Sequence, residues 1–447
     1  MAKTDTDMTT GSIWRHLLTF SVPMALGLLF QQLYNMVDTL VVGQFVGETA
    51  QAAVGTTGPI INTIVGFCAG LATGASVIIS QRYGAHDQQG LSRAVHTTIT
   101  ITFVISAIST LLGLAIIEPM LRFMRTPDNV WEESKAYLSI YFSGVTGVLF
   151  YNMGSGILRA VGDSRRPLIF LAISAGLNIV LDLVFVLVFK LGVQGVAYAT
   201  IIAQFLSAAL ILVTLTRERS AYGLRWGRLG IDRIALTGIL RVGLPSSIQS
   251  AITAFSNVYV MSYINAFGSA CMAGYGIYNK LDAFVLIPVQ AISMSSTTFV
   301  GQNWGADDPG RARRGVRTAI IMSLIATASL GAVALVLSRQ LLGFFSPVAE
   351  VVDYGQRFLR IVTPFYLVIC FNQILSGALR GTGDATVPTI IMLGSFVVFR
   401  QIYLYVTNLL NLGFVSVALA YPMGWVLCST LLIIRYIKSP LGQGRKA

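Results

Sequence analysis

Long apolar stretches with almost no charge constrain this chain most strongly. Segments 99–117, 168–189, 319–337 and 414–434 each approach the roughly 20 residues that an α-helix needs to cross a bilayer. Charged residues make up 11% of the 447 positions, whereas an ordinary soluble domain has about 25%. These two features predict an all-α polytopic membrane protein.

The hydropathy pattern predicts twelve transmembrane helices. Several of them exceed the thickness of the hydrocarbon core, so we expect them to tilt, bend or extend beyond it. The expected ranges are 13–43, 50–80, 94–117, 135–158, 168–189, 193–216, 234–264, 270–300, 317–345, 357–379, 388–410 and 414–437.

The second half of the chain repeats features of the first half at a constant spacing. LRAVGDSRRP at 158–167 and LRGTGDATVP at 379–388 share Leu, Arg, Gly, Asp and Pro at the same places, 221 positions apart. The loop at 81–87 matches the loop at 302–308 at this spacing, and Pro23 recurs 222 positions later. The repeat predicts two pseudo-symmetric six-helix bundles, which share one orientation because each has an even number of spans.

The expected domain organisation follows from this repeat. It comprises an N-terminal tail (1–12), an N-lobe (13–216), a basic linker (217–233), a C-lobe (234–437) and a C-terminal tail (438–447). The repeated turn joins the fourth and fifth helices of each lobe, and its residues are predicted to organise the chain rather than bind substrate. These turn residues are Arg159, Gly162, Asp163, Arg380, Gly383 and Asp384.

Basic residues are concentrated on one side of the predicted topology. The linker at 217–233 and the arginines at 311–317 lie on the side of both termini. Because short cytoplasmic loops carry an excess of Lys and Arg, this bias predicts a multi-pass protein of the cell (inner or plasma) membrane with both termini cytoplasmic. The same bias and contact with anionic membrane lipids explain the net charge of +12, which gives no support to nucleic-acid binding.

The sequence contains no familiar catalytic motif. It has no nucleotide-binding loop, no HExxH zinc helix and no GxSxG nucleophile elbow. The four cysteines lie inside apolar segments without a CxxC pair and are expected to pack as small apolar residues. A membrane enzyme would need a reactive cluster in a loop, but the adjacent acids Asp307 and Asp308 belong to the repeated loop. The chain is therefore predicted not to be an enzyme and to need no cofactor or resident metal.

Three aspartates inside predicted spans are the strongest candidates for function: Asp38, Asp182 and Asp282. A carboxylate at membrane depth costs about 2.5–3.5 kcal/mol on insertion scales, so each needs a compensating role.

Two of these aspartates extend polar stripes at helical spacing. The stripes consist of Gln31, Tyr34, Asn35 and Asp38 on the first helix and of Ser174, Asn178 and Asp182 on the fifth. We expect them to meet in a cavity of the N-lobe. There the two carboxylates could take up and release a proton, bind Na⁺ together with Asn178 and backbone oxygens, or form a static polar cluster that locks the helices together.

The second half carries a different set of polar residues at membrane depth. Asp282 and Lys280 are two residues apart, so their side chains point to different faces of the eighth helix. Arg400 of the eleventh helix is the candidate partner of Asp282, either in a structural salt bridge or in a substrate contact. The seventh helix is polar but has no acid. The remaining candidates for a substrate cavity are Asn152 in the fourth helix of the first half and, in the second half, Gln249, Thr253, Asn257 and Tyr278.

Three motifs together resemble the multidrug and toxic compound extrusion (MATE) transporters over nearly the whole chain. They are QLYNMVDTLVVG at 32–43, the paired Gln-x-x-Gly-Ala loops and the paired Leu-Arg-x-x-Gly-Asp turns. The resemblance implies two six-helix lobes around a central cleft, and exchange of H⁺ or Na⁺ for cationic organic compounds. It also implies that Asp38 couples ion and substrate, with Asn178 and Asp182 as in the DinF-like branch. Around Thr253 and Ile369 the chain lacks the acids of the NorM-like branch.

The expected function is a monomeric antiporter that exports small cationic organic compounds. H⁺ is the preferred coupling ion because a carboxylate pair suffices for it, whereas Na⁺ needs further oxygen ligands. The alternative is a flippase for lipid-linked saccharides, whose cavity would need Arg or Lys for pyrophosphate. Only Lys280 and Arg400 are candidates for that role.

Overall fold

The computed structural model describes residues 6–124 and 126–445, with the backbone alone at 39, 40, 48, 49, 51, 56, 59, 255 and 258. Helices account for nearly all of this part of the chain, and no strand occurs in it. Ten of its helical segments are long and apolar enough to cross a membrane. The other two predicted spans correspond to α4–α5 (Asp128–Ser143 and Val145–Ala160) and to α8 (Arg233–Asn265). The predicted all-α membrane fold is confirmed.

The chain forms two compact units. The first comprises residues 1–7 and 26–247, and the second comprises residues 8–25 and 248–447. Two helices therefore change unit along their length: α1 (Ile13–Val41) begins in the second unit, and α8 begins in the first.

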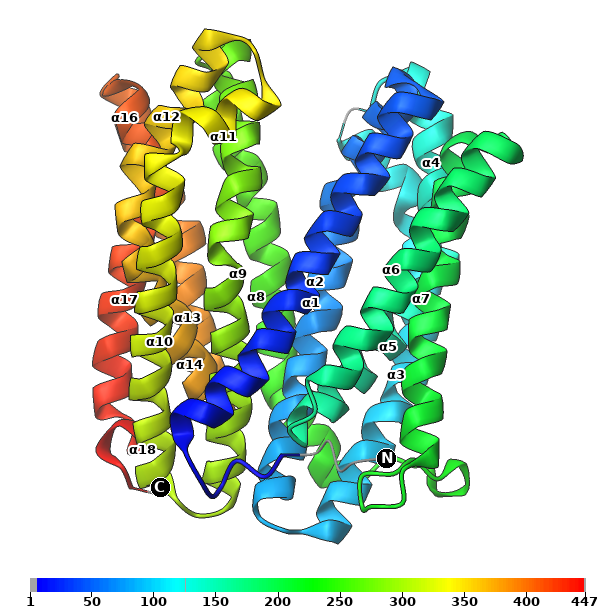
Figure 1. The fold of residues 1–447 in the computed structure, drawn as a ribbon, viewed down its shortest axis with the longest axis vertical. Helices are drawn as coiled ribbons and strands as arrows, with labels where there is room; N and C mark the ends of the chain where they lie inside the picture. Colours follow the sequence, from blue (N-terminus) through cyan, green and yellow to red (C-terminus); the bar gives the residue numbers. More distant parts are fainter. Residues whose placement is uncertain (1–5, 125, 446–447) are drawn as a thin grey trace. The chain divides into compact units, whose positions relative to one another are not determined.

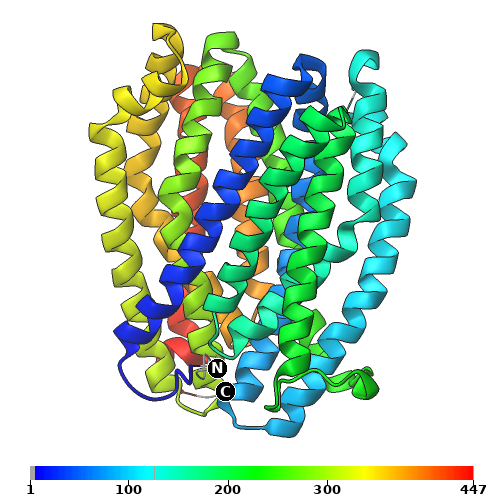
Figure 2. The same ribbon diagram turned by 45° about the vertical axis from the view of Figure 1, so that its right-hand side comes forward.

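In the first unit, α2 packs on α5, and α7 packs on both α5 and α6 (Figure 1). The α2–α3 loop and the linker after α7 lie at the same end of this unit in both ribbon views (Figures 1 and 2). Its further elements are η1 (Val42–Val46), α2 (Glu48–Gly84), α3 (Gln88–Phe123), α6 (Arg165–Leu183), η2 (Val184–Val188), α7 (Gly192–Arg217) and η3 (Trp226–Arg228).

In the second unit, α9 packs on α10, α12 and α13, and α13 packs on α17. The α9–α10 loop and α18 share one end of this unit (Figures 1 and 2). Its elements after α8 are α9 (Ser269–Gly305), α10 (Pro309–Val336), α11 (Ser338–Phe345), α12 (Ala349–Val362), η4 (Thr363–Phe365), α13 (Tyr366–Gly381), α14 (Thr386–Leu393), η5 (Gly394–Phe399), α15 (Arg400–Leu409), α16 (Gly413–Ala418), α17 (Ala420–Lys438) and α18 (Pro440–Gln443).

Several predicted helices are not continuous α-helices in the structure. The span 168–189 contains the π-helical segment η2, and the span 414–437 is divided at Leu419 into α16 and α17. The span 135–158 is divided at Gly144 into α4 and α5. The span 357–379 passes through the 3₁₀ turn η4, where Pro364 has no N–H to donate to a helical bond. The span 317–345 is divided at Leu337, and the span 388–410 contains the π-helical segment η5.

A glycine with positive φ ends the predicted fourth membrane helix of each half. Gly162 has φ +88° and Gly383 has φ +95°. In both turns the glycine N–H donates to the carbonyl three residues earlier, and the following aspartate N–H donates five residues back, at 2.9 Å for Asp163 and 3.1 Å for Asp384. This Schellman pattern satisfies carbonyls at the helix end and favours glycine, which has no Cβ to strain the left-handed backbone.

The charged residues of the turns act differently in the two halves. Asp163 accepts hydrogen bonds from the backbone N–H groups of Arg165 and Arg166, whereas Asp384 pairs with Arg435 at 2.6 Å. Arg380 does not contact its own turn aspartate. Its Nη2 donates to Ser376 and Gln249 instead, which links α13 to α8.

The backbone repeats the spacing found in the sequence. Positive-φ residues occur in pairs 221 positions apart: His86 and Asp307, Lys190 and Asn411, and the glycine pairs 47 and 268, 162 and 383, and 192 and 413. The aspartates that follow His86 and Asp307 are N-caps of helices. Asp87 accepts from Gly90 N, and Asp308 accepts from Arg311 N. The two halves therefore share their turn geometry as well as their sequence motifs.

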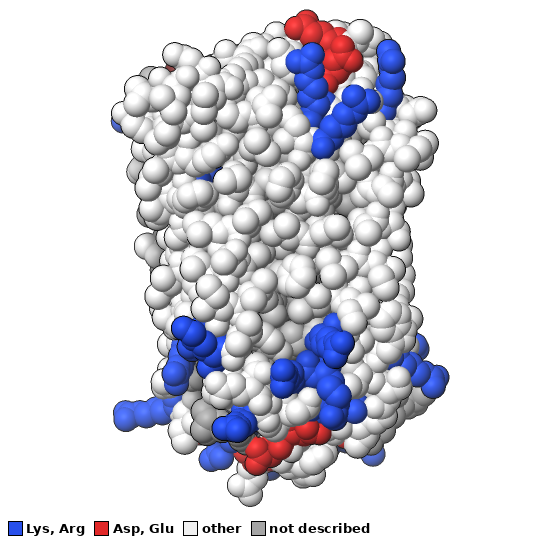
Figure 3. Space-filling view, turned by 90° about the vertical axis from the view of Figure 1, so that its left-hand side faces the viewer, with Lys and Arg blue, Asp and Glu red and all other residues white. Residues whose placement is uncertain are grey.

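The surface of the helices is predominantly apolar where it contacts no other helix. Leu111 is 71% exposed on α3, and Val336 is 77% exposed on α10. On the face shown in Figure 3, Lys and Arg gather near the two ends, and the band between them is almost free of charge. Exposed side chains of this kind are stable in lipid, in agreement with the membrane-spanning fold.

Backbones approach closely where the first part of α8 crosses α2. A Cβ built on Gly74 would lie 2.4 Å from the carbonyl oxygen of Ile239 and 2.6 Å from the Cα of Gly243. One turn along, a Cβ on Gly70 would lie 2.3 Å from the backbone N of Ser247. Small residues four apart on both helices allow this contact, which is typical of helix pairs in membranes.

A candidate ion-coupling site in the first unit

Two helices bring the predicted acids of the first half together. Asp38 comes from α1, and Asn178 and Asp182 come from consecutive turns of α6. The carboxyl groups of Asp38 and Asp182 lie within hydrogen-bonding reach of each other. With its amide nitrogen facing the acids, Asn178 donates to Asp38 Oδ1 at 3.0 Å and to Asp182 Oδ2 at 3.2 Å. The predicted meeting of the two polar stripes thus occurs in the structure.

Neighbouring helices complete the cluster. The carbonyl oxygen of the Asn178 side chain accepts from the backbone N–H of Thr200 on α7 at 3.3 Å. The hydroxyl of Tyr34 donates to Thr200 Oγ1 at 3.5 Å and also lies within hydrogen-bonding reach of Asp38. Asn178 and Asp182 are fully buried. One oxygen of Asp182, Oδ1, has no hydrogen-bond partner among the described residues.

This arrangement is suited to holding one positive charge. Two ionised carboxylates within hydrogen-bonding reach repel each other strongly in a low-dielectric environment, and a shared proton or a bound cation removes the repulsion. The unpartnered oxygen of Asp182 is available to accept a bond from such an ion. The single amide of Asn178 contacts both acids, so a change of charge on either one alters the same hydrogen-bonded cluster.

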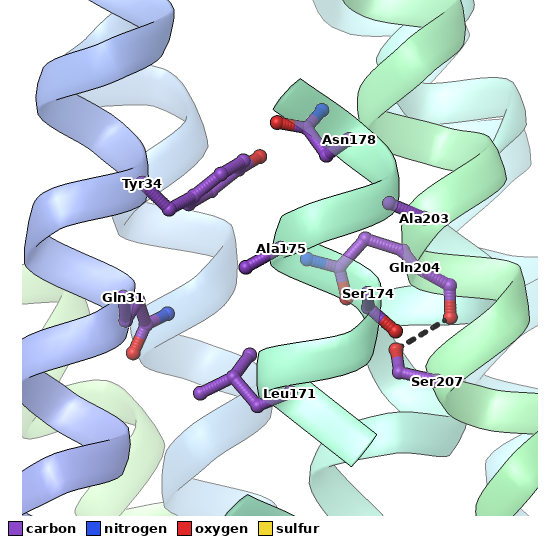
Figure 4. A pocket seen from close by; sticks show the side chains of 9 residues that line it. All are labelled: Gln31, Tyr34, Leu171, Ser174, Ala175, Asn178, Ala203, Gln204 and Ser207. Carbon is purple, nitrogen blue, oxygen red and sulfur yellow. Dashed lines mark hydrogen bonds between the residues drawn. The ribbon is translucent and has the colours of Figure 1, made fainter. Parts of the chain in front are cut away.

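A pocket of about 290 Å³ borders this cluster (Figure 4). Asn178 forms part of its wall, which connects the pocket directly to the carboxylate pair. The other lining residues are Gln31 and Tyr34 of α1, Leu171, Ser174 and Ala175 of α6, and Ala203, Gln204 and Ser207 of α7. Three predicted cavity residues, Gln31, Tyr34 and Ser174, therefore line it.

The contribution of α7 was missed by the sequence analysis. Thr200, Gln204 and Ser207 occur at positions i, i+4 and i+7 of an otherwise apolar helix. This spacing places them on one face, which is the signal that could have identified them. Two other candidates of the first half lie elsewhere: Asn35 does not line the pocket, and Asn152 donates to the carbonyl of Val148 in its own helix.

In the second unit, Asp282 is bound by tyrosines rather than by arginine. Its Oδ1 accepts from Tyr278 at 3.2 Å and from Tyr366 of α13. Arg400 Nη2 donates instead to Ser256 Oγ and Asn257 Oδ1 of α8, both at 2.9 Å. No ion pair joins Asp282 to Arg400 in the described part of the chain. Of the two alternatives for this pair, the salt bridge does not occur in the structure, because α8 reaches the guanidinium and α13 reaches the carboxylate.

The remaining candidates of the second half have other contacts. Lys280 is exposed and lies over the ring of Phe345, with 5.7 Å between Nζ and the ring centroid. Gln249 contacts Met392, Thr389 and Arg380. The Thr253 hydroxyl is buried and has no hydrogen-bond partner among the described side chains and backbone.

Membrane-spanning helices with a pair of carboxylates beside a pocket are typical of a membrane transporter. Comparison with known proteins identifies its family. The MatE family model matches residues 23–184 and again residues 245–406, so each half of the chain matches it once. The chain belongs to the MATE family of transporters, whose members are not enzymes.

Individual relatives agree with this membership. The chain is 30% identical over 435 residues to the probable multidrug resistance protein YoeA of Bacillus subtilis, covering 95% of this chain and 93% of that protein. It is 27% identical over 439 residues to the probable multidrug resistance protein YpnP of the same organism, covering 96% of each. A solved outward-facing structure of a multidrug resistance MATE family transporter superimposes with a TM-score of 0.93 at 23% identity, covering all of both chains. The predicted family and the two-lobed helical fold are thus confirmed.

Proposed function

We propose that this transporter exports small cationic organic compounds in exchange for H⁺, using Asp38 and Asp182 as the coupling acids. The observation that carries the proposal is the contact of Asn178 with both carboxylates and with the wall of the pocket. A proton on the acid pair and a substrate in the pocket therefore compete for, or reshape, the same hydrogen-bonded cluster. Such differential interaction is what links two binding events.

The available driving force is sufficient for export. One pH unit supplies about 1.36 kcal/mol per proton, which corresponds to roughly tenfold accumulation. A membrane potential of 100 mV adds about 2.3 kcal/mol for each net charge moved. Exchange of one proton for one compound can therefore drive uphill export without ATP.

The proposal includes a topology and a single functional subunit. We place both termini in the cytoplasm, because the basic linker at 217–233 and the arginines at 311–317 lie on the side of the termini in the predicted twelve-helix topology, and cytoplasmic loops carry an excess of Lys and Arg. One chain contains both units, so a monomer suffices. H⁺ is preferred over Na⁺ because Asp38, Asp182 and the amide of Asn178 provide few oxygen ligands for a metal ion.

The test is ethidium efflux from reconstituted vesicles under an imposed gradient. We expect a pH gradient to drive efflux and an equal Na⁺ gradient at constant pH to leave the rate at the level of leakage. Efflux driven only by Na⁺ would contradict proton coupling and assign a sodium ion to the Asp38–Asp182 pair. Absence of efflux under both gradients would favour the alternative of a flippase, and a lipid-linked saccharide would then be tested as the substrate.

A further inference from the structure

The repeat relates residues of α1 to residues of α8 one by one. Pro23 and Pro245 are 222 positions apart, whereas Gly47 and Gly268, which precede α2 and α9, are 221 apart. The π-helical segment η1 lies between these points and contains the extra residue of the first half. Equivalent residues of the two halves are therefore 222 positions apart on the N-terminal side of η1. The residues Tyr34, Asn35 and Asp38 therefore correspond to Ser256, Asn257 and Val260.

A similar comparison relates α6 to α14 and α15. The spacing is 221 at the start, between Pro167 and Pro388, and again at the end, between Gly192 and Gly413. Each half has one π-helical segment in this interval. In the second half, η5 ends directly before residue 400, and in the first half, η2 begins two residues after residue 182. Residues that follow η5 in the second half and precede η2 in the first half are therefore 222 positions apart. Asn178 and Asp182 therefore correspond to Arg400 and Leu404, while Thr200 and Tyr421, on helices without an insertion, correspond at 221.

In both units the residue at this position of the repeat, Asn178 or Arg400, contacts the same two neighbouring helices. In the first unit, Asn178 contacts Asp38 and Thr200. In the second unit, Arg400 donates to Ser256 and Asn257, and its guanidinium carbon lies 5.0 Å from the ring centroid of Tyr421. Both clusters thus join the equivalents of α1, α6 and α7. The second unit holds a counterpart of the ion-coupling site.

The charge of this counterpart is reversed. The positions of the two acids are occupied by Val260 and Leu404, both fully buried, and the neutral amide is replaced by the guanidinium of Arg400. Arg400 is only 4% exposed and forms no ion pair with a described residue. Its Nε has no hydrogen-bond partner in the same part of the chain. The buried acid Asp282 acts electrostatically on the same tyrosines as this guanidinium, Tyr275 and Tyr421. It is hydrogen-bonded to Tyr278 and Tyr366, however, and does not pair with the guanidinium. A buried positive charge without an ion pair is costly, and a ligand of opposite sign would offset that cost.

We propose that Arg400, with Ser256 and Asn257, forms an anion-binding site for the carboxylate of an organic compound. The Nε–H of Arg400 has no partner among the described residues, and a carboxylate oxygen can accept from it in a charge-assisted hydrogen bond. A single cation bordered by Val260, Leu404 and the Tyr421 ring suits a monoanion on an apolar, aromatic body. The inference rests on the proposed export function and extends its substrates to compounds that carry a carboxylate beside their positive charge.

A matched pair of dyes tests this site by binding alone. Rhodamine B carries a free carboxylate, and in its ethyl ester a neutral ethoxycarbonyl group replaces that carboxylate on the same cationic ring system. We would measure the Kd of both dyes by fluorescence anisotropy with the purified full-length protein in detergent. In Arg400→Gln we expect the Kd of rhodamine B to rise at least tenfold and the Kd of the ester to change less than twofold. No gradient is present, so failure of coupled export would not affect this result.

A second variant covers the case in which Arg400→Gln does not fold. Asn257→Asp places an internal carboxylate beside the guanidinium, so we expect the same selective loss of rhodamine B binding. The control is Asn408→Asp, which adds the same charge at an exposed position of α15; it should leave both Kd values unchanged. Equal changes for dye and ester in Asn257→Asp would overturn the inference. So would the absence of rhodamine B binding to the wild type, or its displacement by phosphatidylglycerol but not by benzoate, which would assign the site to a lipid headgroup.

Discussion

Replacement of Asp38 by asparagine is expected to reduce pH-driven ethidium efflux at least tenfold. The amide keeps the size and hydrogen-bonding capacity of the side chain but cannot bind and release a proton. Asp182 would then be the only carboxyl group of the pair. The pair could no longer switch between a state with a shared proton and a state with two negative charges. Initial rates of efflux from vesicles with equal amounts of protein measure the effect, and Asp182→Asn should show a similar loss.

A matched control separates coupling from general damage. Glu118→Gln also neutralises an acid, but Glu118 is an exposed residue that pairs with Lys135 at 2.6 Å. Exposed pairs contribute little to stability, so this variant should keep at least half of the wild-type rate. The amide at position 38 mimics the protonated acid, so the affinity of Asp38→Asn for ethidium should depend less on pH than that of the wild type, whereas Glu118→Gln should keep the wild-type pH dependence. Normal efflux by Asp38→Asn would mean that the acids form only a static polar cluster.

The second large effect is expected on stability, at the crossing of α2 and α8. Gly74→Ala would place a methyl group 2.4 Å from the carbonyl oxygen of Ile239 and within 2.6 Å of the backbone of Gly243. Backbone atoms cannot rotate away as a side chain can, so the two helices must separate. Forcing extra volume into a packed contact typically costs about 1–3 kcal/mol. We expect a clear decrease in the Tm of the purified protein.

Gly176 provides the matched comparison for this variant. It also lies inside a helix, α6, but a Cβ at this position would meet nothing within 4 Å. Gly176→Ala should therefore leave the Tm unchanged or raise it slightly, because alanine favours the helix. Equal Tm values for the two alanine variants would contradict this prediction, because they would mean that α2 and α8 can move apart at little cost in stability.

Local patterns predicted a large part of this structure. Apolar runs of sufficient length predicted the membrane helices, because a span must satisfy its backbone internally whatever its neighbours are. The four-residue spacing of Ser174, Asn178 and Asp182 predicted a shared helix face, and this face meets Asp38 in the structure. Helical periodicity depends only on the chain itself, which is why it can be inferred from one sequence.

Contacts between distant helices were much harder to predict. Asp282 was assigned to Arg400 on the basis of charge alone, but Tyr278 and Tyr366 bind it. Which side chain reaches a given acid depends on helix rotation, and a single π-helical insertion such as η5 rotates every residue that follows it. Nothing in the residue types of 394–399 marks that insertion. The breaks at Gly144 and Leu337 likewise depend on packing, because neither position contains proline.

The division of α1 and α8 between the units has a consequence for the independence of the two halves of the chain. A cut in the linker at 217–233 would yield two fragments, and neither would contain a whole unit. The first would lack residues 233–247, and the second would lack residues 8–25, where Met8 N donates to Gln302 and Met8 O accepts from Arg311. Each unit is therefore completed by the start of a helix that continues into the other unit, which is the connectivity of a domain-swapped dimer within one continuous chain.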